Sequence, residues 1–120
     1  MFFQMPPKPS FRNMFKQDLY NRLIRMSNNN TGQQLRQVLM QECVMYSCDM
    51  CLEFQRKSEG LLTIDYLEHI VTETVEAIRL VLPQSLSFRD NQIAIEKVKS
   101  LMQQPGNLFQ AKVDKYYNRC

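Results

Sequence analysis

The stretch that decides the fold is Cys43-Val44-Met45-Tyr46-Ser47-Cys48-Asp49-Met50-Cys51-Leu52-Glu53-Phe54, near the middle of the chain. Its apolar side chains are too closely spaced to fall on one face of a helix. A helix that is apolar on several faces has to be covered from several sides. The stretch therefore predicts a helix at the centre of the molecule.

This helix is predicted to be long. Thr31 with Gln34 three residues later is typical of a capping box at a helix N-terminus. Nothing from there to Lys57 breaks a helix, and about 27 residues give about 40 Å at 1.5 Å per residue. Gly60 is expected to end the helix in the left-handed conformation. The apolar run 61–63 then predicts a short extended connection.

Amphipathic helices are predicted on both sides of this one. Before it, prolines fix an extended segment over 6–9, and apolar residues at spacings of three and four predict a helix from about residue 11 to Met26. The polar run 27–30 should stop it. After the long helix, the pattern predicts a helix capped by Thr63 and ended by Pro83, a helix opened by Ser87 with Asp90 and reaching Met102, and a short helix over 108–117.

The predicted fold class is all-α. Residues 1–10 form an extended N-terminal arm, 11–82 a helical core and 83–120 a helical extension with one or two helices. Two arrangements stay open. Either the first three helices form an open half that a partner completes, or the C-terminal helices fold back and make a four- or five-helix bundle.

Composition limits the function classes. A chain of 120 residues with only three glycines fits one domain and lacks the glycine that phosphate-cradling loops use. The ends are basic and the middle, 31–88, is acidic, which is not the broad basic face of a dedicated nucleic-acid binder. No apolar run is long enough to span a membrane. Three of the four cysteines lie within nine residues of one predicted helix, where they are poorly placed to form disulfides. Free thiols predict a reducing compartment, nuclear or cytoplasmic, with a mitochondrial location less favoured.

The candidate chemistry is sparse. Cys48 and Cys51 form a C-x-x-C, and Cys43 and His69 are conceivable further zinc ligands. Zinc modules place such cysteines on tight turns, whereas this pair sits within a helical pattern, so buried thiols are favoured over a metal site. No spacing supports a nucleophile–base pair. We expect no cofactor, no metal and no enzymatic activity.

The order of elements over residues 11–80 resembles the histone fold. It is a medium helix, a polar loop, a long helix, a short link and another helix. The telling segment is 54–71, with Arg56-Lys57 at the helix end, Leu62-Thr63 in the link and Asp65 at the start of the next helix. Both loops, 27–32 and 59–63, lack the basic residues of DNA-binding members. The resemblance is therefore to subunits of transcription complexes, the TATA-binding-protein-associated factors and their co-activator relatives, and it implies pairing with a helical partner.

The function predicted from the sequence is protein–protein interaction through the long central helix, inside a nuclear transcription or chromatin complex. The alternatives are a free-standing helical-bundle adaptor, assembly factor or viral interaction protein, and a nucleic-acid-binding helical domain that uses the basic ends. The candidate partner interface comprises Leu39, Cys43, Tyr46, Met50, Phe54, Leu67, Ile70 and Val71. The candidate nucleic-acid contacts are Arg12, Lys16, Arg22 and Arg25.

Overall fold

The long helix α3, Gly32–Lys57, is the element around which the others are arranged. The computed structural model describes residues 17–59, 61–83 and 85–119. The remaining helices of these ranges are α2 (Gln17–Asn29), α4 (Ile64–Val81), α5 (Phe88–Met102) and α6 (Gly106–Tyr116). No strand occurs in them. The all-α prediction is therefore confirmed over the described part of the chain.

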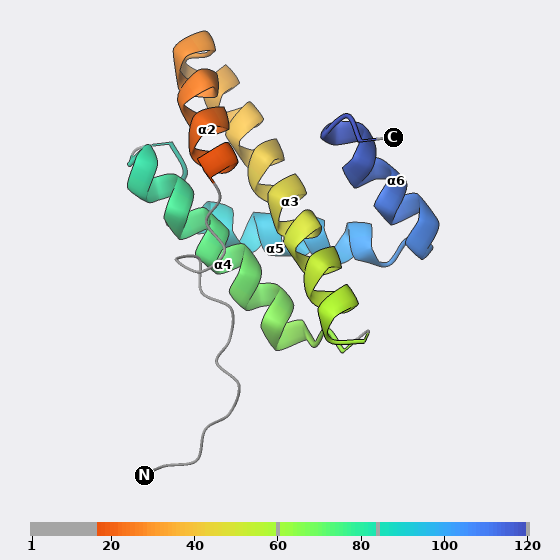
Figure 1. The fold of residues 1–120 in the computed structure, drawn as a ribbon. Coiled ribbons are helices and arrows are strands. Elements are labelled where there is room, and N and C mark those ends of the chain that lie inside the picture. The colour runs from red at the N-terminus through yellow and green to blue at the C-terminus, as the bar shows by residue number, and fades with distance from the viewer. Residues whose placement is uncertain (1–16, 60, 84, 120) are drawn as a thin grey trace.

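Helix α3 contacts each of the other four helices. Helix α4 returns along α3 after the 61–63 link, and α5 crosses behind both (Figure 1). Helix α2 rests on α3 and α4, while α6 packs against α3 and α5. The predicted position of the long helix, covered from several sides, is confirmed.

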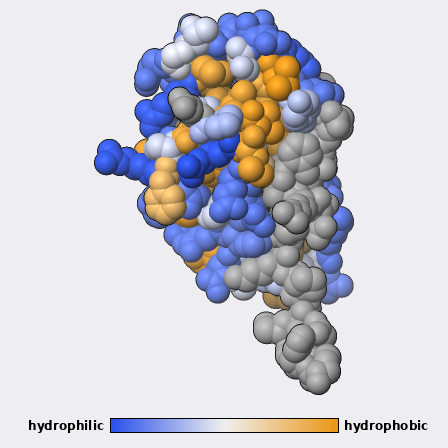
Figure 2. Space-filling view, turned by 90° about the vertical axis from the view of Figure 1, so that its left-hand side faces the viewer, coloured by the Kyte–Doolittle hydropathy of each residue, from blue (hydrophilic) through white to orange (hydrophobic). Residues whose placement is uncertain are grey.

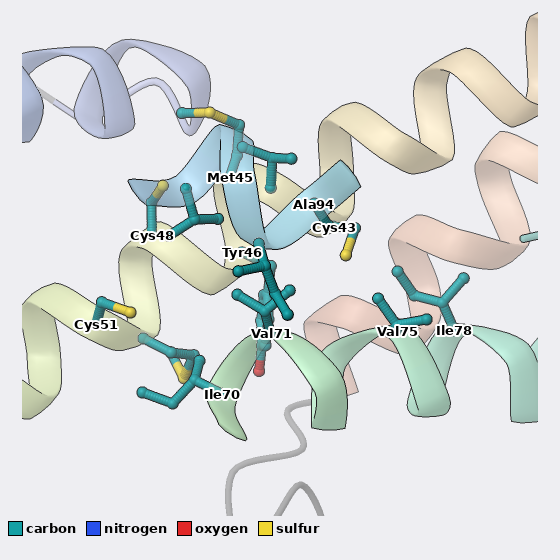
Figure 3. Packing of buried hydrophobic residues seen from close by; sticks show 14 of the residues in the cluster. Cys43, Met45, Tyr46, Cys48, Cys51, Ile70, Val71, Val75, Ile78 and Ala94 are labelled. Atoms are coloured by element: carbon teal, nitrogen blue, oxygen red, sulfur yellow. The ribbon is translucent and has the colours of Figure 1, made fainter. Parts of the chain in front are cut away.

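The middle of α3 has no exposed side. Ten consecutive residues, Glu42 to Cys51, are buried. Figure 3 shows Cys51 of this stretch on the side of Ile70 of α4 and Cys48 on the side of α5, and all three belong to one apolar core. The C-terminal helices contribute to the same core through Ala94, Val98, Phe109 and Val113. Of the two arrangements that the sequence allowed, the structure shows the bundle in which the C-terminal helices fold back.

Two helix starts match their sequence signals. The Thr63 hydroxyl accepts a hydrogen bond from the backbone N–H of Tyr66 (3.2 Å), as expected for an N-cap. The Asp90 carboxylate accepts one from the backbone N–H of Ser87 (2.7 Å) and so closes the first turn of α5. Helices α4 and α5 therefore begin where their capping residues predict.

Two other predicted helix ends need correction. Thr31 stands at the N-cap of α3 but makes no side-chain cap hydrogen bond, so the predicted capping box with Gln34 does not form. The helix instead begins at Gly32 with φ of +55°, a left-handed geometry that only glycine adopts without strain. Helix α2 runs past Met26, because the backbone and side-chain amides of Asn30 both bond to the Met26 carbonyl oxygen (3.0 and 3.1 Å). The predicted N-terminal arm and Gly60 lie outside the described residues.

Candidate functional site

The candidate partner interface lies inside the molecule. Its residues share one apolar core with the other helices, and seven are buried: Leu39, Cys43, Tyr46, Met50, Leu67, Ile70 and Val71. Phe54 is partly buried and stacks on Tyr66 with ring centroids 4.7 Å apart. The structure thus brings these residues together, but the chain's own helices cover them. They are not a free surface in this conformation.

The candidate nucleic-acid contacts are divided. Arg12 and Lys16 lie outside the described residues. Arg25 is exposed on α2. Arg22, one turn earlier, turns its guanidinium inward to the fully buried carboxylate of Glu42, with Nε 3.1 Å from both oxygens and Nη2 2.8 Å from Oε1. Its role here is internal pairing.

Glu42 is the centre of a polar cluster that joins three helices. Besides Arg22 of α2, it accepts a hydrogen bond of 2.6 Å from the hydroxyl of Tyr116 on α6. The hydrogen bonds to Glu42 raise the pKa of Arg22. Burial first, and then the bond to Glu42, raise the pKa of Tyr116. Both partners are therefore held in the protonated forms that donate to the buried carboxylate.

A second pair extends this cluster to the end of the described chain. Arg119 places Nη1 and Nη2 at 2.8 and 2.9 Å from the two carboxylate oxygens of Asp49. Its guanidinium also lies 4.7 Å from the centre of the Tyr117 ring, which Arg22 approaches to 5.1 Å. The residues after α6 are thereby joined to α3 by the Arg119–Asp49 pair and to α2 by the contact of Arg22 with the Tyr117 ring.

Sequence reasoning missed both carboxylates. Glu42 and Asp49 are seven residues apart, which is two helical turns, so they lie on one face of α3. An acidic side chain within a buried run needs a charged or hydrogen-bonding partner. That spacing was the available signal for an internal pairing face.

The three described cysteines are buried and unreactive as nucleophiles or metal ligands. Cys43, Cys48 and Cys51 are buried as free thiols. Burial raises the pKa of Cys43 and of Cys51 to about 12, and it raises that of Cys48 as well. No thiolate, the form that attacks or binds metal, is favoured there. In the described ranges no three His, Cys, Asp or Glu side chains gather to hold a metal ion, and His69 lies 3.7 Å from Glu73 of its own helix.

A groove with a volume of about 660 Å³ lies between α3 and α5. Its floor is apolar and is formed by Met40, Val44, Ile93 and Leu101. Its rim is polar and comprises Gln33, Arg36, Gln37, Gln41, Lys97 and Ser100, and the buried Asp90 lines it from within. An apolar floor with a polar rim is the usual anatomy of a binding surface.

One end of the groove is fixed by an ion pair. Arg36 of α3 donates to Asp90, whose side chain is fully buried. Burial alone would raise the pKa of Asp90, but the hydrogen bonds from Arg36 and Ser87 and the charge of Arg36 lower it below its usual value. Asp90 therefore stays ionised and holds the two walls of the groove together. No sequence signal joined these two residues, which are 54 positions apart.

A second apolar area lies where α4 turns into α5. Leu80 and Phe88 are the most exposed large apolar side chains described there, at 84% and 83%. The depression beside them is lined by Glu76, Arg79, Leu80 and Pro83. Figure 2 shows apolar surface on the side of the molecule that carries α2 and α4. All the residues that line this depression come from the end of α4 or just after it, and two of them are charged. It is therefore less enclosed than the groove, which has a helix on each side.

None of the helices in the described ranges is both long and apolar enough to cross a membrane. Comparison of the chain with protein-family models, with curated proteins and with solved structures finds no match.

Proposed function

We propose that this chain is a non-enzymatic adaptor, a self-covered helical bundle that binds another protein in the groove between α3 and α5. The observation that carries the proposal is a contrast within α3. Residues 42–51 are enclosed by the chain's own helices, whereas the groove beside residues 33–44 is open and has an apolar floor. When a partner covers open apolar surface of this kind, the free energy of the system falls, which favours binding.

The lining of the groove favours binding over catalysis. Its one carboxylate, Asp90, is held by Arg36 and Ser87. Among the described residues that line the groove there is neither His nor Cys, so none of them places a histidine base beside the Ser100 hydroxyl of the kind that activates a serine. The buried thiols of α3 fit a reducing compartment, and we place the adaptor in the cytoplasm or nucleus.

Pairing through the long helix, the function that the sequence first indicated, needs α5 and α6 to leave α3. Such a movement would uncover the core and separate Glu42 and Asp49 from Tyr116 and Arg119. The adaptor function needs no rearrangement. Light scattering during size-exclusion chromatography separates the two: a monomer with one unfolding transition supports the adaptor, and a dimer that separates only on unfolding supports pairing.

Site-specific photo-crosslinking tests whether the groove is used. A photoreactive amino acid at Gln37, exposed on the groove rim, is compared with the same residue at Lys112, which is exposed on α6 and lies outside both apolar areas. We expect a defined covalent adduct with one protein from position 37 alone, in cells of the native host. That adduct should disappear when Ile93→Lys fills the groove with a charge. Equal adducts from both positions, or none, would contradict the proposal.

A further inference from the structure

We propose that the ligand of the α3–α5 groove is an amphipathic helix of about three turns from another protein, with aliphatic side chains on one face and a carboxylate that meets Lys97. The inference rests on the proposed function and specifies the chemistry of the partner. The groove's backbone, length, floor and charge each support one part of it.

The backbone of the groove walls requires a ligand that satisfies its own hydrogen bonds. Both walls are α-helices, α3 and α5, whose main-chain N–H and C=O groups bond within the helix beyond its first turn. No strand edge exists in the described ranges to accept an extended peptide. An extended ligand would press unpaired amides against an apolar floor, which costs free energy. A helix carries no such cost, because its main-chain bonds are internal.

The length of the walls sets the length of the ligand. The lining residues run from Gln33 to Val44 on α3 and from Asp90 to Leu101 on α5. Each wall is therefore about 16 Å long at 1.5 Å per residue. Side chains at positions i, i+3 or i+4, and i+7 of a ligand helix span about 10.5 Å along its axis. Three anchors on one helical face fit within the groove, with a polar residue at each end.

The floor calls for aliphatic anchors. Ile93 is 38% exposed although it is a large apolar residue inside a hollow. Met40 and Leu101 beside it are partly buried, so side chains of the ligand would complete their burial. Met40 is unbranched and can adapt to the shape of an anchor. These groups offer shape and apolar contact and no hydrogen bond, which favours Leu, Ile or Met on the partner.

The charge of the groove calls for a carboxylate. Arg36 and Asp90 neutralise each other. Lys97 is exposed on the rim, and no ion pair joins it to a carboxylate among the described residues. Gln33, Gln37 and Gln41 add neutral amides at a spacing of four along α3. The groove therefore has one uncompensated positive charge, and an acidic residue on the ligand's polar flank is complementary to it.

Methionine-methyl NMR on the full chain tests the inference. Met40 reports on the groove, and Met102, which lines a separate depression beside Leu62 and Thr63, serves as the internal control. The main probe is a 14-residue helical peptide whose central three turns carry leucines at i, i+3 and i+7 and one flanking Glu. Three matched probes keep its length: Glu replaced by Lys, the leucines moved off one face, and a proline placed at the centre.

We expect the main probe to shift the Met40 signal and leave Met102 unmoved. The Lys probe should bind about threefold or more weakly, the size of an exposed ion pair. Lys97→Glu should reverse this preference. Lys112→Glu makes the same charge change at an exposed position of α6 and should not reverse it. Equal binding of the proline or rearranged peptide at Met40 would overturn the helical ligand. So would a preference for Lys by the wild-type chain, or dimerisation through the groove.

The two proposals can fail separately. If no peptide shifts Met40 but crosslinking from position 37 still finds one protein, the helical ligand is wrong and the adaptor function stands. If both experiments are negative, the groove is not a binding site.

Discussion

At the scale of single residues, Glu42 decides how two distant parts of the chain are held. It is fully buried, and its oxygens accept from Arg22 and Tyr116. A buried carboxylate that keeps its partners adds little net stability, but one that loses its cation is costly. The cluster therefore specifies where α2 and α6 dock more than it adds to the free energy of unfolding.

Arg22→Met should lower the free energy of unfolding by about 3 kcal/mol, because Glu42 is then buried without a cation. Arg25→Met, on the exposed side of the same helix, should change it by less than about 0.5 kcal/mol. Urea unfolding followed by circular dichroism measures both. Adding Glu42→Leu to Arg22→Met should recover part of the loss. Equal effects of the two arginine variants would show that the pair is not structural.

The buried thiols should resist labelling. In a Cys120→Ser background, Cys43, Cys48 and Cys51 should not react with a disulfide reagent at pH 8 while the chain is folded. With a pKa of about 12 for Cys43, about one thiol in ten thousand is ionised at that pH, and the reagent cannot reach it. Three equivalents should react in urea. Rapid labelling of the native chain would mean that α3 is accessible.

At the scale of elements, the Arg36–Asp90 pair connects the start of α5 to α3. The folded-state pKa of Asp90 lies below its unfolded value of 3.8. Its contribution to stability is therefore full above about pH 4 to 5 and is lost as the pH falls through the lower, folded-state pKa. The groove wall should loosen in acid and not in base.

Asp90→Asn should lower the free energy of unfolding by about 2 kcal/mol at pH 6, since it removes a charged, buried acceptor. The difference between wild type and variant should shrink below about pH 4, where Asp90 takes up a proton in the unfolded chain before it does so in the folded one. Asp65→Asn, exposed in the first turn of α4, should cost less than about 1 kcal/mol. A wild-type–variant difference that stays constant from pH 6 to pH 2.5 would contradict the assignment.

The elements themselves could be predicted from sequence, but their arrangement could not. Local signals such as Thr63, Ser87 and Pro83 place helix ends, because capping and ring geometry act within one turn. The direction from which α5 and α6 approach α3 has no such signal, since a helix that is apolar on all sides presents no preferred face. The α3–α5 groove depends on that direction. Its glutamines therefore gave no signal in the sequence that a groove lies beside them.

At the scale of the whole molecule, both ends of the described chain dock on α3. In a variant whose Tyr20, Tyr46 and Tyr66 are replaced by phenylalanine, tyrosine fluorescence reports on Tyr116 and Tyr117 at the end of α6, while circular dichroism reports on all helices. Both signals should be lost at the same urea concentration, because α6 shares one core with the rest. Phe109→Ala, at 3% exposure, should move both curves together by about 3 kcal/mol. Loss of the tyrosine signal first would show that α6 unfolds alone.

The unbroken burial of residues 42–51 also governs how this sequence can change over generations. On α4, which has an outward face, tolerated substitutions should recur every three to four positions. Over 42–51 no position faces outward, so a mutational scan should show ten intolerant positions in a row. Only swaps that conserve volume, such as methionine for leucine, should survive there. Substitutions of this kind would keep the length of α3 and its apolar character on every side, while the identities of its residues change.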